Sequence, residues 1–258
     1  MHDDTGRCDA PVVHKPCKIA YMKTCLQSKF DEEGRAFFDA VVRTRISARA
    51  YGEESVSRSL IEELLGLAAR APSNSNTQPW TAHVLTGRAK QQLSELLLAS
   101  HERNDLPQSA HFPSILPPAC RPRQEDFGER YYTALSIDRT DVQARSQQTA
   151  RNFKFFDAPV GLVFTIDERL TAYSWADFGM FLQTFMLAAT SRGLATCPQV
   201  SLARHAPVIR SALDLDSNQT VVCGMALGHA EVEAPVNRME MPREPIKSFT
   251  VFHGFPHS

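Results

Sequence analysis

Apolar residues recur at helical spacing in the first third of the chain. One such segment runs from Glu32 to Thr44, and a second begins after Ser57, a suitable N-cap, and ends before Pro72. A third runs from Lys90 to Ser100. A proline restricts the residue before it to extended backbone, so Pro72 is expected to close the second helix.

Three segments have the character of strands. Thr81–Leu85 alternates apolar and polar residues, whereas Val160–Ile166 and Thr220–Leu227 are apolar on both faces and predict interior strands. Helical segments separate these strands, and a short helix is expected near Pro207. The order predicts an α+β or α/β fold with a central mixed sheet.

The segment 174–192 is the most strongly helical. Ser174 and Asp177 resemble a capping box at its start, and Gly193 is a suitable residue for its end. Apolar side chains surround almost its whole circumference. We therefore expect this helix to be buried in a core or across a subunit interface.

Residues 101–130 differ from the rest of the chain. Five prolines among charged residues predict an irregular segment, and we expect it to form a lid or rim near the active site. Helical character returns between Thr140 and Phe153. We treat about 101–150 as an insertion in one domain, 31–258, that follows a flexible tail, 1–30.

Composition and charge exclude several classes of protein. The net charge of −1 and pI near 6.8 provide no basic field for nucleic acid, and 43% apolar residues suffice for a large core. No apolar run is long enough to span a membrane. The six cysteines lack Cys-x-x-Cys spacing, which favours reduced thiols in the cytoplasm, although the three in the tail could bind a ligand.

Arginines and a hydroxyl cluster at the end of the first helix. Arg45, Ser47 and Arg49 lie within five residues, and guanidiniums suit a terminal phosphate because they stay charged and offer a planar fork of donors. Taken alone, Arg45 and Arg49 are more simply interpreted as solvated charges at a helix end, where the dipole favours cations. Arg243, before Glu244 and Pro245, is the third candidate for phosphate binding.

A run of amides and hydroxyls, Ala71 to Trp80, follows the second helix. Asn74 and Asn76 could simply form turns, but amides together with Pro79 and Trp80 could also bind the edge of a flat heterocycle. The sequence has no Gly-x-Gly-x-x-Gly or Walker motif. A phosphate and a planar ring without a dinucleotide motif indicate FMN.

These segments resemble the signatures of the nitroreductase family of FMN flavoproteins. The similar motifs are Arg45-x-Ser47-x-Arg49-x-Tyr51, Ala71-Pro72-Ser73-x-x-Asn76-x-Gln78-Pro79-Trp80, Gly193-Leu194-x-Thr196-Cys197-Pro198-Gln199, and Gly224 to His229 followed by Arg243-Glu244-Pro245-Ile246. They occur in the family's order from about Phe37 to Phe255. The run from Asn152 to Gly161, with the insertion before it, is similar to the nitrobenzoate-reductase-like branch.

The resemblance implies a fold, an assembly and a cofactor site. The fold is a three-layer α/β/α arrangement with a central mixed sheet, in an intertwined homodimer with a C-terminal arm at 246–252. The expected FMN-binding residues are Arg45, Ile46, Ser47, Arg49, Pro72, Ser73, Asn74, Asn76, Pro198, Gln199 and Arg243. Pro72, Ser73 and Asn74 are expected to reach the flavin held mainly by the other subunit. A backbone N–H near Pro198 and Gln199 is expected to face flavin N5.

The resemblance also implies the reaction. NADH or NADPH would pass a hydride to flavin N5 and leave, and a nitroaromatic or similar electron-poor acceptor would then be reduced, in a ping-pong sequence. Alternatives are a flavin-dependent dehydrogenase, oxidase or dehalogenase, and a non-enzymatic flavin carrier. Hydride transfer needs proximity more than proton shuttling, so no side chain is expected to be catalytic.

Other chemistries find no support in the sequence. Cys197 could suggest a nucleophile, but no base is placed beside it, and a buried thiol is the preferred interpretation. The nine histidines lack metal-ligand spacing, so no metal is expected. No Gly-x-Ser-x-Gly motif indicates a hydrolase.

Overall fold

A computed structural model describes residues 31–104 and 115–255. The tail, with Cys8, Cys17 and Cys25, lies outside the described residues. The chain divides into two compact units, 1–44 and 45–258. In the first unit, α2 (Glu32–Thr44) has the expected bounds, and the Gly34 N–H donates to Asp31 Oδ1 at its start.

The second unit is built on a four-stranded sheet. Its strands are β1 (Thr81–Thr86), β2 (Val160–Asp167), β3 (Ala195–Gln199) and β4 (Gln219–Gly228), in the order β1-β2-β4-β3. Each neighbouring pair is antiparallel. The expectation of a mixed sheet therefore needs correction. In the described parts of the chain, parallel pairing is confined to one isolated bridge, between Ser47, which lies outside the four strands, and Thr196.

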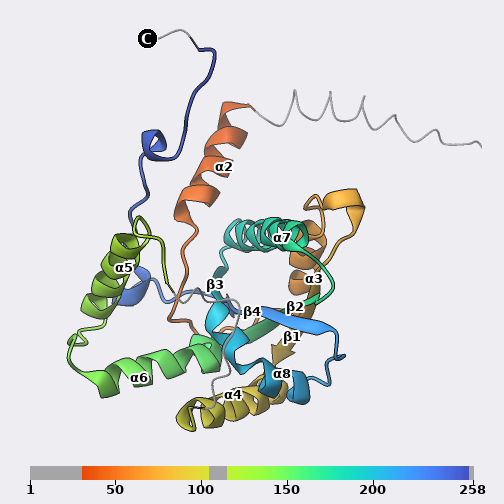
Figure 1. Cartoon of the computed structure of the whole chain (residues 1–258), viewed down its shortest axis with the longest axis vertical. Coiled ribbons are helices and arrows are strands. Elements are labelled where there is room, and N and C mark those ends of the chain that lie inside the picture. The colour runs from red at the N-terminus through yellow and green to blue at the C-terminus, as the bar shows by residue number, and fades with distance from the viewer. Residues whose placement is uncertain (1–30, 105–114, 256–258) are drawn as a thin grey trace, which may run out of the picture. The chain divides into compact units, whose positions relative to one another are not determined.

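Helices cover both faces of the sheet, which confirms the three-layer arrangement (Figure 1). α3 (Arg58–Ala68) and α7 (Ala172–Thr190) pack on one face, and α4 (Gly87–Glu102) and α8 (Ala206–Ala212) on the other. Successive residues of a strand point to opposite faces, so β2 contributes Leu162 and Phe164 to the first core and Val163 to the second. β2 is buried along its length, as its apolar sequence predicts.

Two helix ends agree with the sequence-based predictions, and a third differs from them. The Ser57 hydroxyl caps α3 by accepting the Leu60 N–H at 3.2 Å, and Gly193 takes the left-handed conformation (φ 73°) after α7. The capping box predicted at Ser174 is wrong. α7 begins at Ala172, and the Asp177 carboxylate accepts a hydrogen bond from outside the helix.

The proline-rich segment is more regular than its composition predicts. It contains α5 (Arg121–Ala134), followed by α6 (Val142–Ala150) and the 3-10 turn η2 (Arg151–Asp157). Pro122 lies in the first turn of α5, where the missing N–H would have no helical partner anyway. The expectation of an irregular segment up to residue 130 is therefore wrong from Arg121 onward.

The remaining elements are short 3-10 turns: η1 (Asn74–Asn76), η3 (Val200–His205), η4 (Pro235–Asn237) and η5 (Ile246–Ser248). Within the ranges that the structure describes, no helix is both long and apolar enough to cross a bilayer. In those same ranges, no group of three histidine, cysteine or acidic side chains is placed to hold a metal.

Candidate flavin site

The segment from Arg45 to Tyr51 runs beside strand β3. The Ala48 N–H donates to the Thr196 carbonyl at 3.1 Å, next to the parallel bridge between Ser47 and Thr196. At its other end, Tyr51 forms an antiparallel bridge with Ala230, after β4. The third sequence motif, of which β3 is part, therefore lies directly against the first.

Asn237 clamps the middle of this segment to the chain after β4. Its Oδ1 accepts the Arg49 N–H at 2.7 Å, and its Nδ2 donates to the carbonyls of Ala50 at 2.8 Å and Glu231 at 2.9 Å. The Asn237 side chain is buried, so these bonds satisfy a polar group that would otherwise be costly to bury. Its local sequence gives no sign of this role.

The folded chain brings Arg45 and Arg243 within electrostatic range of each other. Burial lowers the pKa of the half-buried Arg45 guanidinium, and the positive charge of Arg243 lowers it further. Arg243 is exposed and donates to the carbonyls of Met241 and Pro242, both at 3.0 Å. Within the described ranges, neither guanidinium has a carboxylate partner. Neighbouring cations without counter-charges favour a bound anion.

Arg49 has a different environment from Arg45. Its Cζ lies 5.3 Å from the ring centroid of Phe127 and 5.0 Å from that of Tyr131, both on α5. Its Nη1 donates to the Ser47 carbonyl at 3.1 Å. The sequence interpretation did not include Phe127 and Tyr131, although their spacing of four on one helix places them on one face.

Cys197 lies beside these arginines but is a poor nucleophile. The thiol is buried, and burial raises its pKa to about 11, although the charges of Arg49 and Arg45 oppose that rise. A thiol with this pKa is protonated at neutral pH, and the thiolate is the reactive form. The buried-thiol interpretation is the one that the structure supports.

Pro198 and Gln199 close strand β3. Pro198 is half-buried and has no N–H, so of these two residues only Gln199 could offer a backbone donor. The Gln199 side chain is buried, and its Nε2 donates to the Asn152 carbonyl at 2.7 Å. This amide therefore joins the end of β3 to the turn that follows the insertion. Its role toward a cofactor stays a prediction.

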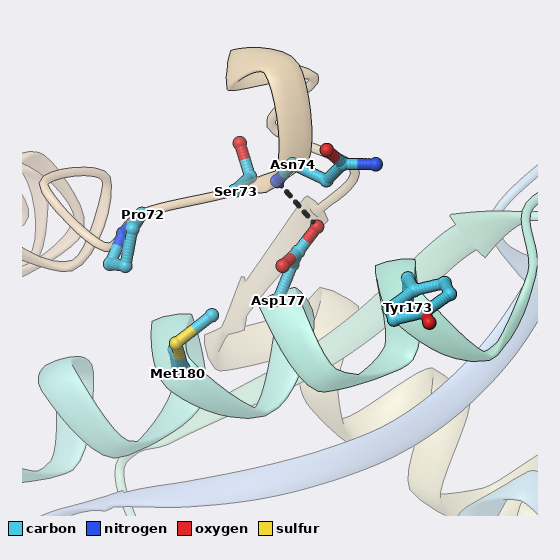
Figure 2. A pocket seen from close by; sticks show the side chains of 6 residues that line it. All are labelled: Pro72, Ser73, Asn74, Tyr173, Asp177 and Met180. Carbon is cyan, nitrogen blue, oxygen red and sulfur yellow. Dashed lines mark hydrogen bonds between the residues drawn. The ribbon is translucent and has the colours of Figure 1, made fainter.

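The Asn/Ser loop is held by α7 and by its own side chains. The Asn74 N–H donates to Asp177 Oδ2 at 3.0 Å (Figure 2), and the Gln78 N–H donates to Ser73 Oγ at 3.0 Å. Ser75, Asn76 and Gln78 have φ values of 51°, 57° and 48°, all in the left-handed region. Such backbone is uncommon outside glycine and is often found at functional sites.

A shallow pocket of about 440 Å³ lies between this loop and α7. Figure 2 shows Pro72, Ser73 and Asn74 on the loop side, and Tyr173, Asp177 and Met180 on the helix. Ser73 is half-buried, whereas Pro72, Asn74 and Asn76 are exposed. The pocket thus contains three of the predicted site residues.

The predicted residues therefore form two groups in one chain. Arg45, Ile46, Ser47, Arg49 and Arg243 gather near β3, with Pro198 and Gln199 on that strand, whereas the loop residues lie against α7. Across residues 31–104 and 115–255, no hydrogen bond or ion pair links the loop with Arg45, Arg49 or Arg243. Two separate half-sites are what a chain would carry if a second copy completes each cofactor site.

The comparisons with known proteins identify the family. Residues 42–229 match the model of the nitroreductase family. The chain is 52% identical over 218 residues to 4-nitrobenzoate reductase of Pseudomonas putida, covering 84% of this chain and 96% of that protein. The chain belongs to the nitroreductase family.

Other family members agree with this assignment. Nitrobenzene nitroreductase of Ectopseudomonas oleovorans is 38% identical over 219 residues, which cover 84% of this chain and 96% of that protein. The solved FMN and NADPH-dependent nitroreductase NfnB from a Sphigopyxis strain superposes with a TM-score of 0.82 at 35% identity, covering 84% of this chain and 99% of that one. The FMN-dependent NfnB of Mycobacterium smegmatis, solved in complex with NADPH, gives 0.81 at 30% identity over 85% of this chain and 99% of its own. The family signature and the nitrobenzoate-reductase-like branch predicted from the motifs are confirmed.

Proposed function

We propose that this protein is an FMN-dependent NAD(P)H oxidoreductase that reduces nitroaromatic compounds with ping-pong kinetics. The structural observation that carries the proposal is the approach of Arg45 and Arg243, two guanidiniums without a carboxylate partner in the described ranges. Support from outside the structure comes from the relatives, whose names include 4-nitrobenzoate reductase and FMN and NADPH-dependent nitroreductase.

The side chains present fit a flavin mononucleotide. Arg45 and Arg243, with the Ser47 hydroxyl nearby in the same segment, provide a donor set for a phosphate dianion. The loop around Asn74 and Asn76 provides amides and backbone groups in a fixed, left-handed conformation. Bound FMN would supply the hydride transfer between a nicotinamide and the nitro group.

The protein's own contribution is binding and orientation. Arginines fix the phosphate end, and the loop held by Asp177 fixes the position of amides that could meet the ring. Since no hydrogen bond or ion pair joins the two groups in the described parts of one chain, we propose a homodimer in which each cofactor site takes one group from each copy. The acceptor that we propose is a small, electron-poor nitroarene such as a nitrobenzoate, and the electron donor is NADH or NADPH.

The test is the absorption spectrum of the purified protein, followed by anaerobic titration with NADH and with NADPH. We expect a yellow protein whose flavin bands bleach with at least one nucleotide and return when 4-nitrobenzoate is added. A colourless protein that takes up no FMN at micromolar concentration would refute the cofactor. A flavoprotein that bleaches but does not recolour with any nitroarene would refute the acceptor.

A further inference from the structure

The elements on either side of α5 and α6 are joined by ring contacts. α4 precedes these helices along the chain and η2 follows them, and the buried ring of Phe153 in η2 is the meeting point. Its centroid lies 4.9 Å from that of His101, in the last turn of α4, and 4.6 Å from that of His205, in η3. Three elements that are distant in sequence therefore meet at two histidines and one phenylalanine.

A buried hydrogen bond strengthens the same junction. The Ser100 hydroxyl of α4 and Nδ1 of His205 lie 2.9 Å apart, and both side chains are buried. The other ring nitrogen of His205, Nε2, is also buried, and it has no hydrogen-bond partner in the ranges that the structure describes. An imidazolium carries an N–H on both nitrogens, so the charged ring would hold one buried donor without an acceptor. Ser100, His101, Phe153 and His205 are called the histidine cluster below.

The charged groups that act on His205 also disfavour a proton on its ring. Burial lowers the pKa of His205, and repulsion from His101 of α4 and Arg204 of η3 lowers it further. Strand β4, which packs on η3, has no charged residue. Other charged side chains of the packed elements near these positions are exposed or bonded elsewhere: Glu102, Lys154, Arg210, and the Arg151–Asp157 pair.

We propose that the histidine cluster is a pH-sensitive contact, which holds the end of α4 to η2 and η3 at neutral pH and opens locally in mild acid. Opening exposes the His205 ring to water, where a charged imidazolium is hydrated and the repulsion from its neighbours is screened. The inference goes beyond the proposed function and is independent of any cofactor. It makes the junction beside α5 and α6 the first part of the second unit to loosen as the pH falls.

The direction of the effect follows from which form binds the proton. In the open form His205 has the ordinary histidine pKa of about 6.5, whereas in the closed form its pKa is lower. Above this pH both forms are neutral, so opening does not depend on pH. Below it the open form holds one more proton, and the equilibrium constant for opening rises by up to about tenfold per pH unit.

Hydrogen exchange of the purified full-length protein, followed by mass spectrometry between about pH 7.5 and 5.5, tests the proposal. After correction for the intrinsic exchange rate, protection of the last turn of α4 and of η2 should fall by up to about tenfold per unit below pH 6.5. It should also stay below the protection of β2 and β4, which exchange by global unfolding. His205→Gln cannot take up the proton and should abolish the fall.

Two further variants control for folding and for histidines in general. His83 of β1 is half-buried, and burial lowers its pKa as well, but its ring contacts Thr165 of β2. His83→Gln should therefore keep the wild-type pH dependence at α4 and η2. His101→Gln removes one of the two repulsive neighbours of His205 and should make the total fall smaller, which provides the test if His205→Gln does not fold.

Three results would overturn the inference. Protection at α4 and η2 that does not change with pH would show that no proton is linked to their opening. Protection equal to that of β2 and β4 at every pH would show that His205 is exposed only by global unfolding. A fall that persists in His205→Gln and in His101→Gln would assign the proton to another group. A protein that takes up no FMN would refute the proposed function and leave this test unaffected.

Discussion

The backbone N–H of Asn74 donates a 3.0 Å hydrogen bond to Oδ2 of Asp177, and this contact ties the Asn/Ser loop to the first half of helix α7. Asp177 is buried, so the bond satisfies a carboxylate that has little access to water. The loop conformation, with its left-handed residues, is therefore supported by a side chain remote in sequence.

Replacing Asp177 with alanine should loosen this loop. We expect a loss of about 1–2 kcal/mol in the free energy of unfolding, because one buried hydrogen bond to a charged group is removed. Urea unfolding measures the loss, and limited proteolysis should cut faster between residues 72 and 78. Asp177→Asn keeps an acceptor oxygen and should lose less, so equal behaviour of the two variants would contradict the role assigned to the bond.

Arg243→Ala should lower flavin occupancy while the fold is retained. Loss of one charge-assisted phosphate contact is expected to weaken FMN binding by about tenfold to a hundredfold. Arg238→Ala is the control, because Arg238 is exposed and already paired with Glu233. If both variants keep wild-type occupancy, Arg243 does not belong to the phosphate site.

The burial of His205 predicts that the free energy of unfolding decreases in mild acid. It is buried and shares a 2.9 Å hydrogen bond between Nδ1 and the Ser100 hydroxyl. Burial lowers its pKa, and electrostatic repulsion from the neighbouring His101 and Arg204 side chains lowers it further. The folded state keeps this histidine neutral, whereas the unfolded chain takes up a proton as the pH falls through about 6.5, the ordinary histidine pKa.

The contribution of His205 is therefore complete above pH 6.5 and is lost progressively below it. Urea midpoints measured at pH 7.5, about 6.5 and 5.5 should fall more steeply in the wild type than in His205→Gln. The stability difference between the two proteins should shrink toward the acid end. Parallel pH profiles would show that His205 has the same pKa in the folded and unfolded states.

Gly228 lies where the end of β4 meets two other segments. A Cβ there would lie 2.6 Å from the Pro159 Cδ and 3.2 Å from the Tyr51 Cδ1. Gly228→Ala should cost about 1–3 kcal/mol, because the packed neighbours have to move. Gly66→Ala, on α3 with open space around the new methyl group, should instead stabilise by about 0.5–1 kcal/mol. Chemical denaturation compares them, and a harmless Gly228→Ala would contradict the close packing.

Periodicity predicted the elements that form the layers. The apolar stripe through Ile61 and Leu64 places α3 on the sheet, and the doubly apolar run at Val160–Ile166 forms an interior strand. These patterns depend on neighbours within one or two turns, and such local rules are what a single sequence contains. The short strand β3 was identified only as a motif, since five residues that include Pro198 carry little strand signal.

The contacts that arrange the site were harder to predict. The composition of the segment did not predict α5. Proline breaks a helix at most positions, but Pro122 lies in the first turn, where proline is tolerated. Asp177 was interpreted as a capping residue, yet its partner is Asn74, more than a hundred positions away. The arginine motif was found, but the rings that hold Arg49 come from a segment without any flavin-binding signature. Long-range pairings of this kind are decided by tertiary packing.

The Asn237 clamp joins residues 188 positions apart. Closing so long a loop has an entropic cost that is recovered only once the sheet between its ends exists. During synthesis, a ribosome-attached chain that stops short of Asn237 has Arg49 without its backbone anchor, and Arg243 has yet to be made. The proposed anion site is thus among the last parts of the protein to form, and cofactor loading is expected to be a post-translational event.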